Sequence, residues 1–170
     1  MLTIKEITLK NFMSVGNVTQ GVRLSDSGLT LVLGNNLDLG GDGSRNGTGK
    51  TTIVNALSYG LYGQALTNIK RDNLINKTNG KHMLVMIEFV HNNITYRIER
   101  GRKPSVCRFF VNDAEQIDET DEGQGESKLT QEQIQLVITA TGNLAVVVAS
   151  DYVALEIAKK IPDTIKGAID

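Results

Sequence analysis

A short glycine-rich stretch carries the residue types that bind a triphosphate. Residues 47–52 read GTGKTT. They come after the apolar run Leu29–Leu33, Gly34 and an intervening polar segment, and they begin a region with the apolar spacing of a helix. Glycines let successive backbone N–H groups point at phosphate oxygens, and a helix N-terminus adds a fixed positive partial charge. The stretch therefore predicts ATP and Mg²⁺ as cofactors, with Lys50 on the β- and γ-phosphates and the Thr51 hydroxyl on the metal.

The spacing departs from the usual pattern, G-x-x-x-x-G-K-[ST], because Ser44 stands where the first glycine belongs. If ten residues are looped out, either 36–45 or 37–46, the remainder reads GNNGTGKT and satisfies the pattern. Asp38 and Asp42 in this excursion are either polar loop residues or groups that approach Mg²⁺. The alternative is a glycine-rich turn with its lysine on the surface. The predicted nucleotide-binding residues are Gly34, Asn35, Asn36, Asn46, Gly47, Thr48, Gly49, Lys50, Thr51 and Thr52.

The elements before the loop read as strands. Residues 2–10 alternate between apolar and polar, which predicts a half-buried strand with a slip near Glu6, and residues 18–24 predict its partner. The continuous apolar run Leu29–Leu33 is typical of a fully buried strand. We expect it at the centre of a sheet, with the phosphate loop at its C-terminal edge.

The chain beyond the loop predicts a helix, a β-meander and further helical segments. The first helix runs from Lys50 to about Tyr62 and ends at Gly63, a residue type that favours the left-handed cap. The pattern predicts an α/β fold, with a central sheet, flanking helices and an antiparallel β-meander attached to the sheet, as a single domain over 1–170. The meander strands are predicted at 83–90, 94–100 and 106–111, an apolar run at 144–149, and helical spacing at 128–138 and 151–161.

The composition limits the functions that the chain can serve. A length of 170 residues allows a genuine core, and the net charge of −1 predicts no general attraction to nucleic acid or membrane. Cys107 stands alone, which excludes an internal disulfide and suits a reducing compartment. Residues 1–6 form no signal peptide, and no apolar run approaches membrane-spanning length. We expect a cytoplasmic protein without a membrane partner.

Basic residues gather after the first helix and along the meander. They either contact the phosphate backbone of double-stranded DNA or form a solvated strand edge on which Lys and Arg discourage aggregation. The candidate DNA-binding residues are Lys70, Arg71, Lys77, Lys81, Arg97, Arg100, Arg102 and Lys103. Residues 113–126 contain seven acidic residues and no basic ones, which predicts a solvated loop.

Several stretches together resemble one family of DNA-repair ATPases. The order of a strand, Asn11-Phe12, a second strand, the phosphate loop and the helix sequence NALSYGLYG at 55–63 resembles the N-terminal ATPase lobe of SMC-like ATPases of the SbcC type. Further matches are LIN at 74–76 and YRIERG at 96–101. The resemblance covers about residues 1–135 and extends to the large-subunit family of the recombination endonucleases of T-even-like phages. It implies that the protein acts in the cytoplasm of a bacterium or of a phage-infected host cell.

The resemblance implies a P-loop NTPase of the ABC type, in which two heads on long coiled coils sandwich two ATP molecules. It implies as partners a second copy of the ATPase head, a nuclease subunit and double-stranded DNA, in recombination and repair. The family places its Walker B, signature and coiled-coil segments after residue 170, and Ser150 and Asp151 stand where its Mg²⁺-sensing glutamine is expected. The chain is therefore expected to be an N-terminal fragment with little ATP turnover alone. An SMC-type clamp of chromosomal DNA without a nuclease, and a transporter ATPase, are the alternatives.

Overall fold

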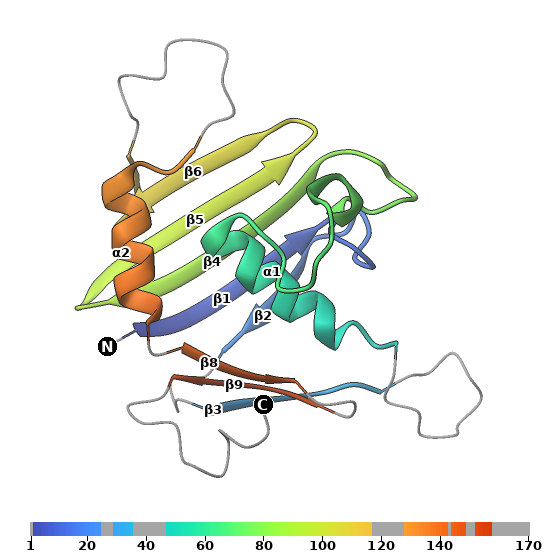
Figure 1. Ribbon diagram of the computed structural model, residues 1–170, viewed down its shortest axis with the longest axis horizontal. Helices are drawn as coiled ribbons and strands as arrows, with labels where there is room; N and C mark the ends of the chain where they lie inside the picture. The colour runs from blue at the N-terminus through green and yellow to red at the C-terminus, as the bar shows by residue number, and fades with distance from the viewer. Residues whose placement is uncertain are drawn as a thin grey trace.

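The structure is a computed structural model that describes residues 2–24, 29–35, 47–116, 128–142, 144–148 and 152–157 (Figure 1). Its elements in chain order are β1 (Leu2–Lys10), β2 (Gln20–Arg23), β3 (Leu29–Leu33), α1 (Lys50–Tyr62), a 3₁₀ turn η1 (Arg71–Leu74), β4 (Met83–His91), β5 (Ile94–Arg102), β6 (Val106–Val111), β7 (Ala114–Glu115), α2 (Gln131–Thr141), β8 (Leu144–Val148) and β9 (Tyr152–Ile157). Of the helices described, none is long and apolar enough to cross a membrane.

The described residues form two sheets, and the larger contains six antiparallel strands in the order β2-β1-β4-β5-β6-β7. The predicted slip near Glu6 is confirmed, because the pairing of β1 with β4 shifts register between Ile4 and Glu6. Ile4 and Ile7 are three residues apart and would point to opposite faces of a regular strand, but the irregularity lets both be buried. The predicted meander is also confirmed as β4, β5 and β6, although it attaches to β1 and not to β3.

Helix α1 packs against this sheet and confirms the predicted helix (Figure 1). Val54, Leu57 and Leu61 are buried on its inner side. Gly60 allows the close approach to β4, since a Cβ there would overlap the Ile87 side chain. The helix ends as predicted at Gly63, which has φ 75° and donates its N–H to the Tyr59 carbonyl at 2.8 Å.

The smaller sheet has three antiparallel strands in the order β3-β9-β8, and two predictions about it are wrong. Among the described strands β3 lies at the edge of its sheet and not at the centre, and Leu31 and Leu33 are 56% and 59% exposed. An apolar run indicates a strand, but its place in a sheet depends on pairing partners elsewhere in the chain. Residues 151–161 were expected to be helical, whereas β9 occupies Tyr152–Ile157, because an apolar run this short fits either structure and here pairs with the neighbouring β8.

Candidate nucleotide-binding site

The end of β3 lies against the start of the glycine-rich loop, although the sequence separates them widely. A Cβ on Gly34 would overlap the Thr48 hydroxyl and would lie 2.6 Å from the Thr48 Cβ. Only glycine permits this approach, so the two flanks of the excursion meet at a position where no side chain fits. The predicted residues Asn36 and Asn46 lie outside the described residues, as do Asp38 and Asp42, and the exact limits of the looped-out segment stay a prediction.

The loop then turns through two glycines in the left-handed conformation. Gly47 has φ 74°, and Gly49, the residue that precedes α1, has φ 86°. Residues with a Cβ disfavour this conformation by about 1–2 kcal/mol. The turn at Gly49 starts the helix without a side-chain cap and without an acidic residue in the first turn. The positive end of the α1 dipole therefore favours an anion at the start of the helix.

Lys50 brings a positive side chain to the same place. It is buried, 7% exposed, and its Nζ donates to the Thr48 hydroxyl at 3.4 Å, so the ammonium group turns back over the loop. The Thr51 side chain is exposed, while the neighbouring Thr52 is buried. Asn35 is exposed at the end of β3. The loop thus combines backbone donors, one lysine and one accessible hydroxyl.

Ser14 also belongs to this neighbourhood, although no sequence motif marks it. Its hydroxyl shares a hydrogen bond with the Thr52 hydroxyl at 3.1 Å, so the turn after β1 touches the start of α1. Three asparagines fix this turn. Asn79 Nδ2 donates to Asn11 Oδ1 at 2.8 Å, and Asn76 Nδ2 donates to the Met13 carbonyl at 2.9 Å. The signal in the sequence was a set of asparagines far apart in the chain, which no local pattern connects.

A magnesium ion fits this donor set as an ion bound chiefly by phosphate and water. In the part of the chain that the structure describes, no three His, Cys, Asp or Glu side chains come together as a metal site. Mg²⁺ at nucleotide sites keeps several waters and takes one or two protein oxygens together with phosphate oxygens. The exposed Thr51 hydroxyl beside the loop is a suitable protein oxygen for such an ion.

The basic residues predicted as one DNA-binding surface lie on both faces of the larger sheet. Arg97 stacks on the Phe110 ring at 4.0 Å and binds Asp113 at 3.0 Å. On the face that carries α1, Arg100 donates to the carbonyls of Gly60 and Leu61, and Arg102 binds the Asp72 carboxylate at 2.6 Å. The remaining five are exposed: Lys70, Arg71, Lys77, Lys81 and Lys103. Arg97 therefore cannot act with Arg100 and Arg102 as one surface.

The comparisons with known proteins identify the class. A family described as the AAA domain (AAA_23) matches residues 6–155, and the chain belongs to this family of ATPase domains. The fold is that of a P-loop NTPase of the SMC-head type, as predicted. A solved SMC head domain with an extended coiled coil, from Pyrococcus furiosus, superposes with a TM-score of 0.53 at 21% identity, over 82% of this chain and 33% of that one.

The relatives are phage proteins. Exonuclease subunit 2 of Enterobacteria phage T4 is 35% identical over 109 residues, which is 64% of this chain and 18% of that protein. Exonuclease subunit 2 of Escherichia phage RB69 is 31% identical over 117 residues, or 69% of this chain and 19% of that protein. The chain is thus an SMC-like ATPase domain related to a phage nuclease subunit, and it spans less than a fifth of the length of these relatives.

Proposed function

We propose that the chain is the ATP-binding lobe of an ATPase subunit in a DNA recombination and repair nuclease complex. The observation that carries the proposal is the contact between Gly34 and Thr48, at which the flanks of the excursion meet and a phosphate loop can close. The loop then holds Mg-ATP with a ten-residue insertion extruded from it, over 36–45 or 37–46.

Each residue of the loop has a defined part in this proposal. The N–H groups from Gly47 to Thr51 surround the β-phosphate, where the α1 dipole favours negative charge. Lys50 neutralises the β- and γ-phosphates, and Thr51 contributes a hydroxyl to the Mg²⁺. When bound, the Mg²⁺ offsets phosphate charge and fixes the geometry of the triphosphate. Thr52, held by Ser14, keeps the first turn of α1 in place beneath the nucleotide.

The lobe acts as one part of a larger assembly in this proposal. It covers less than a fifth of relatives that are named exonuclease subunits, which supports a role with a nuclease subunit, a second ATPase head and double-stranded DNA. The exposed Leu31 and Leu33 on β3, beside the loop, favour the same conclusion because a lobe that acted alone would gain by burying them. Hydrolysis then depends on groups outside this chain, and Mg-ATP binding is its own contribution.

The test is nucleotide binding measured by isothermal titration calorimetry and thermal unfolding. Mg-ATP at one hundred times its dissociation constant should raise the free energy of unfolding by about 2.7 kcal/mol. Lys50→Ala should abolish the effect, whereas Lys10→Ala, at a lysine remote from the loop in sequence, should retain it. An unchanged affinity in Lys50→Ala, or no stabilisation of the wild-type chain, would overturn the proposal.

The DNA part of the proposal has its own measurement. Fluorescence anisotropy with a labelled duplex should show binding that weakens steeply as salt rises, since phosphate contacts release counterions. Replacing the exposed Lys70 and Lys77 by Gln should lower the salt slope, whereas Arg97→Gln, at a residue already paired with Asp113, should leave it unchanged. An affinity for the duplex that changes neither with salt nor with the lysine substitutions would contradict the proposal that this lobe binds DNA.

A further inference from the structure

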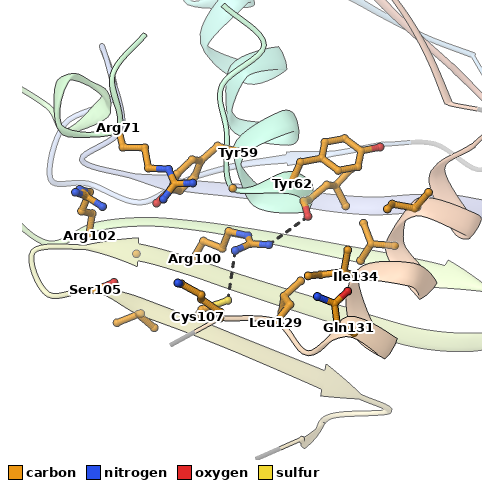
Figure 2. A pocket seen from close by; sticks show the side chains of 17 residues that line it. Tyr59, Tyr62, Arg71, Arg100, Arg102, Ser105, Cys107, Leu129, Gln131 and Ile134 are labelled. Atoms are coloured by element: carbon orange, nitrogen blue, oxygen red, sulfur yellow. Dashed lines mark hydrogen bonds between the residues drawn. The ribbon is translucent and has the colours of Figure 1, made fainter. Parts of the chain in front are cut away.

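A cavity of about 510 Å³ lies at the opposite end of α1 from the glycine-rich loop, between the last turn of α1, strands β5 and β6, and the start of α2 (Figure 2). This volume is within the range of 300–1,000 Å³ typical of small-molecule sites. At 1.5 Å per residue, the 13-residue α1 places it about 18 Å along the helix axis from Lys50. The cavity is therefore separate from the proposed ATP site.

Positive side chains gather in the wall of this cavity. They are Arg71, Arg100, Arg102 and Lys128, and no Asp or Glu is among the described residues that line it. Arg102 is held from outside by Asp72, while Arg71 has no carboxylate partner among the described residues. Arg100 makes its hydrogen bonds to two carbonyls and to the Cys107 thiol, so no carboxylate in the described part neutralises its charge. The cavity is thus an electropositive pocket in a chain of net charge −1.

Three guanidinium groups surround one phenol in this pocket. Figure 2 shows Tyr59 between Arg71, Arg102 and Arg100. Burial raises the pKa of Tyr59, against the opposing effect of these three arginines. The phenol therefore keeps its proton and remains a neutral O–H donor among the cations. Guanidinium forks with a hydroxyl donor match phosphate oxygens better than lysines do.

The other side of the cavity is apolar and partly open. Leu129, Ile134 and Ile138 line it from α2 and the residues before it, and Ile134 and Ile138 are 38% and 50% exposed. Tyr62, 48% exposed, donates its hydroxyl to Thr141 at 2.6 Å, which fixes the aromatic ring between α1 and α2. A fixed, accessible aromatic ring is a stacking surface for a nucleobase.

We propose that this cavity binds a nucleoside monophosphate unit, with the phosphate towards Arg71 and Arg102 and the base against Tyr62 and Ile138. The unit is either a free nucleotide or the 5′-phosphorylated end of a nucleic acid strand, because both present the same phosphate and base. The proposal is independent of ATP binding at the glycine-rich loop.

The test uses the Lys50→Ala chain, so that binding at the loop does not contribute, and calorimetry without Mg²⁺. The probes are dAMP, inorganic phosphate, deoxyadenosine, and one deoxyoligonucleotide with and without a 5′-phosphate. We expect saturable dAMP binding that is about tenfold tighter than binding of phosphate or of deoxyadenosine, since each contributes only half of the contacts. A preference for the phosphorylated oligonucleotide over dAMP would identify the strand end as the source, and the reverse would identify the free nucleotide.

Matched variants locate the site. In the Lys50→Ala background, Arg71→Gln should weaken dAMP binding about tenfold, because it removes a charged donor that supports no other described contact. Tyr62→Leu should weaken it similarly and Tyr62→Phe less, while Lys81→Gln, outside the cavity, should leave it unchanged. No binding of either dAMP or the phosphorylated strand would overturn the proposal. Equal binding of inorganic phosphate, tighter binding of a polyglutamate peptide, or indifference to Arg71→Gln and Tyr62→Leu would also overturn it.

Discussion

The two ends of α1 both gather positive charge, but they do so by different means. At the N-terminus the backbone supplies it, through two left-handed glycines and the positive end of the helix dipole, and Lys50 adds a cationic side chain. At the C-terminus the end of the dipole is negative. Arg100, which lies on β5, donates to two of the last α1 carbonyls, so part of its charge offsets the dipole. The first end depends on backbone shape, and the second depends on side chains brought from several elements.

The largest expected effect tests the shape of the N-terminal end. Gly34→Ala places a Cβ against Thr48, and overpacking of this kind costs about 1–3 kcal/mol, so Mg-ATP affinity should fall by about 10- to 100-fold. Calorimetry measures it. The double variant Gly34→Ala/Thr48→Gly removes the opposing side chain and should recover part of the loss. An affinity unchanged by Gly34→Ala would show that the loop does not close at this contact.

The second effect tests the C-terminal end. Arg100→Met removes the donors to the Gly60 and Leu61 carbonyls and the charge that offsets the dipole, which should lower the free energy of unfolding by about 2 kcal/mol. Arg100→Lys keeps the charge but not the forked geometry, so its free energy of unfolding should lie between those of the wild type and Arg100→Met. Urea unfolding measures both. The affinity for Mg-ATP should not change. A loss of ATP binding in Arg100→Met would contradict the claim that the two ends of α1 act separately.

A smaller effect concerns α2, which forms the apolar wall of the cavity. The Thr130 hydroxyl accepts from the Gln133 N–H at 3.2 Å, and the Gln133 side chain accepts from the Thr130 N–H at 2.9 Å. Thr130→Ala breaks this capping box and should cost about 1 kcal/mol in urea unfolding. Thr130→Ser preserves the hydroxyl and serves as the control. Equal losses in both variants would mean that packing, and not the cap, accounts for the change.

The smallest effect is a dependence on pH. The hydrogen bond and charge of Arg102 hold the pKa of Asp72 below its ordinary value. The pair therefore stabilises the folded chain at pH values above the unfolded pKa of about 3.9, and this contribution is lost as the pH falls through the lowered folded pKa. The difference in melting temperature between wild type and Asp72→Asn should be present at pH 6, shrink in salt, and close in acid. A difference that persists in acid would assign it to something other than this ion pair.

The parts of the fold that could be predicted from the sequence are those determined by residues close together in the chain. Gly63 ends α1 through its own conformation, and the slip near Glu6 follows from the spacing of Ile4 and Ile7. β3 was predicted at the centre of a sheet, and its true position depends on a partner elsewhere in the chain. β9 was predicted as a helix, because an apolar run this short fits either structure.

The same distinction applies to the two sites. The glycine-rich loop was predicted because its glycines, Lys50 and Thr51 are adjacent in sequence. Ser14 was missed because asparagines about 65 residues away fix its turn. The cavity was missed because α1, β5 and α2 each contribute only a few of its residues, and because Arg100 and Arg102 were grouped with Arg97, which lies on the other face.

Backbone amide NMR during titration with Mg-ATP tests the central claim most directly. With ATP near saturation of its tighter site, the largest shifts should fall on the amides of residues 47–52, with little change at Arg100 to Cys107. Lys50→Ala should remove those shifts. Shifts that avoid the loop, or that persist in Lys50→Ala, would contradict a triphosphate site at the start of α1.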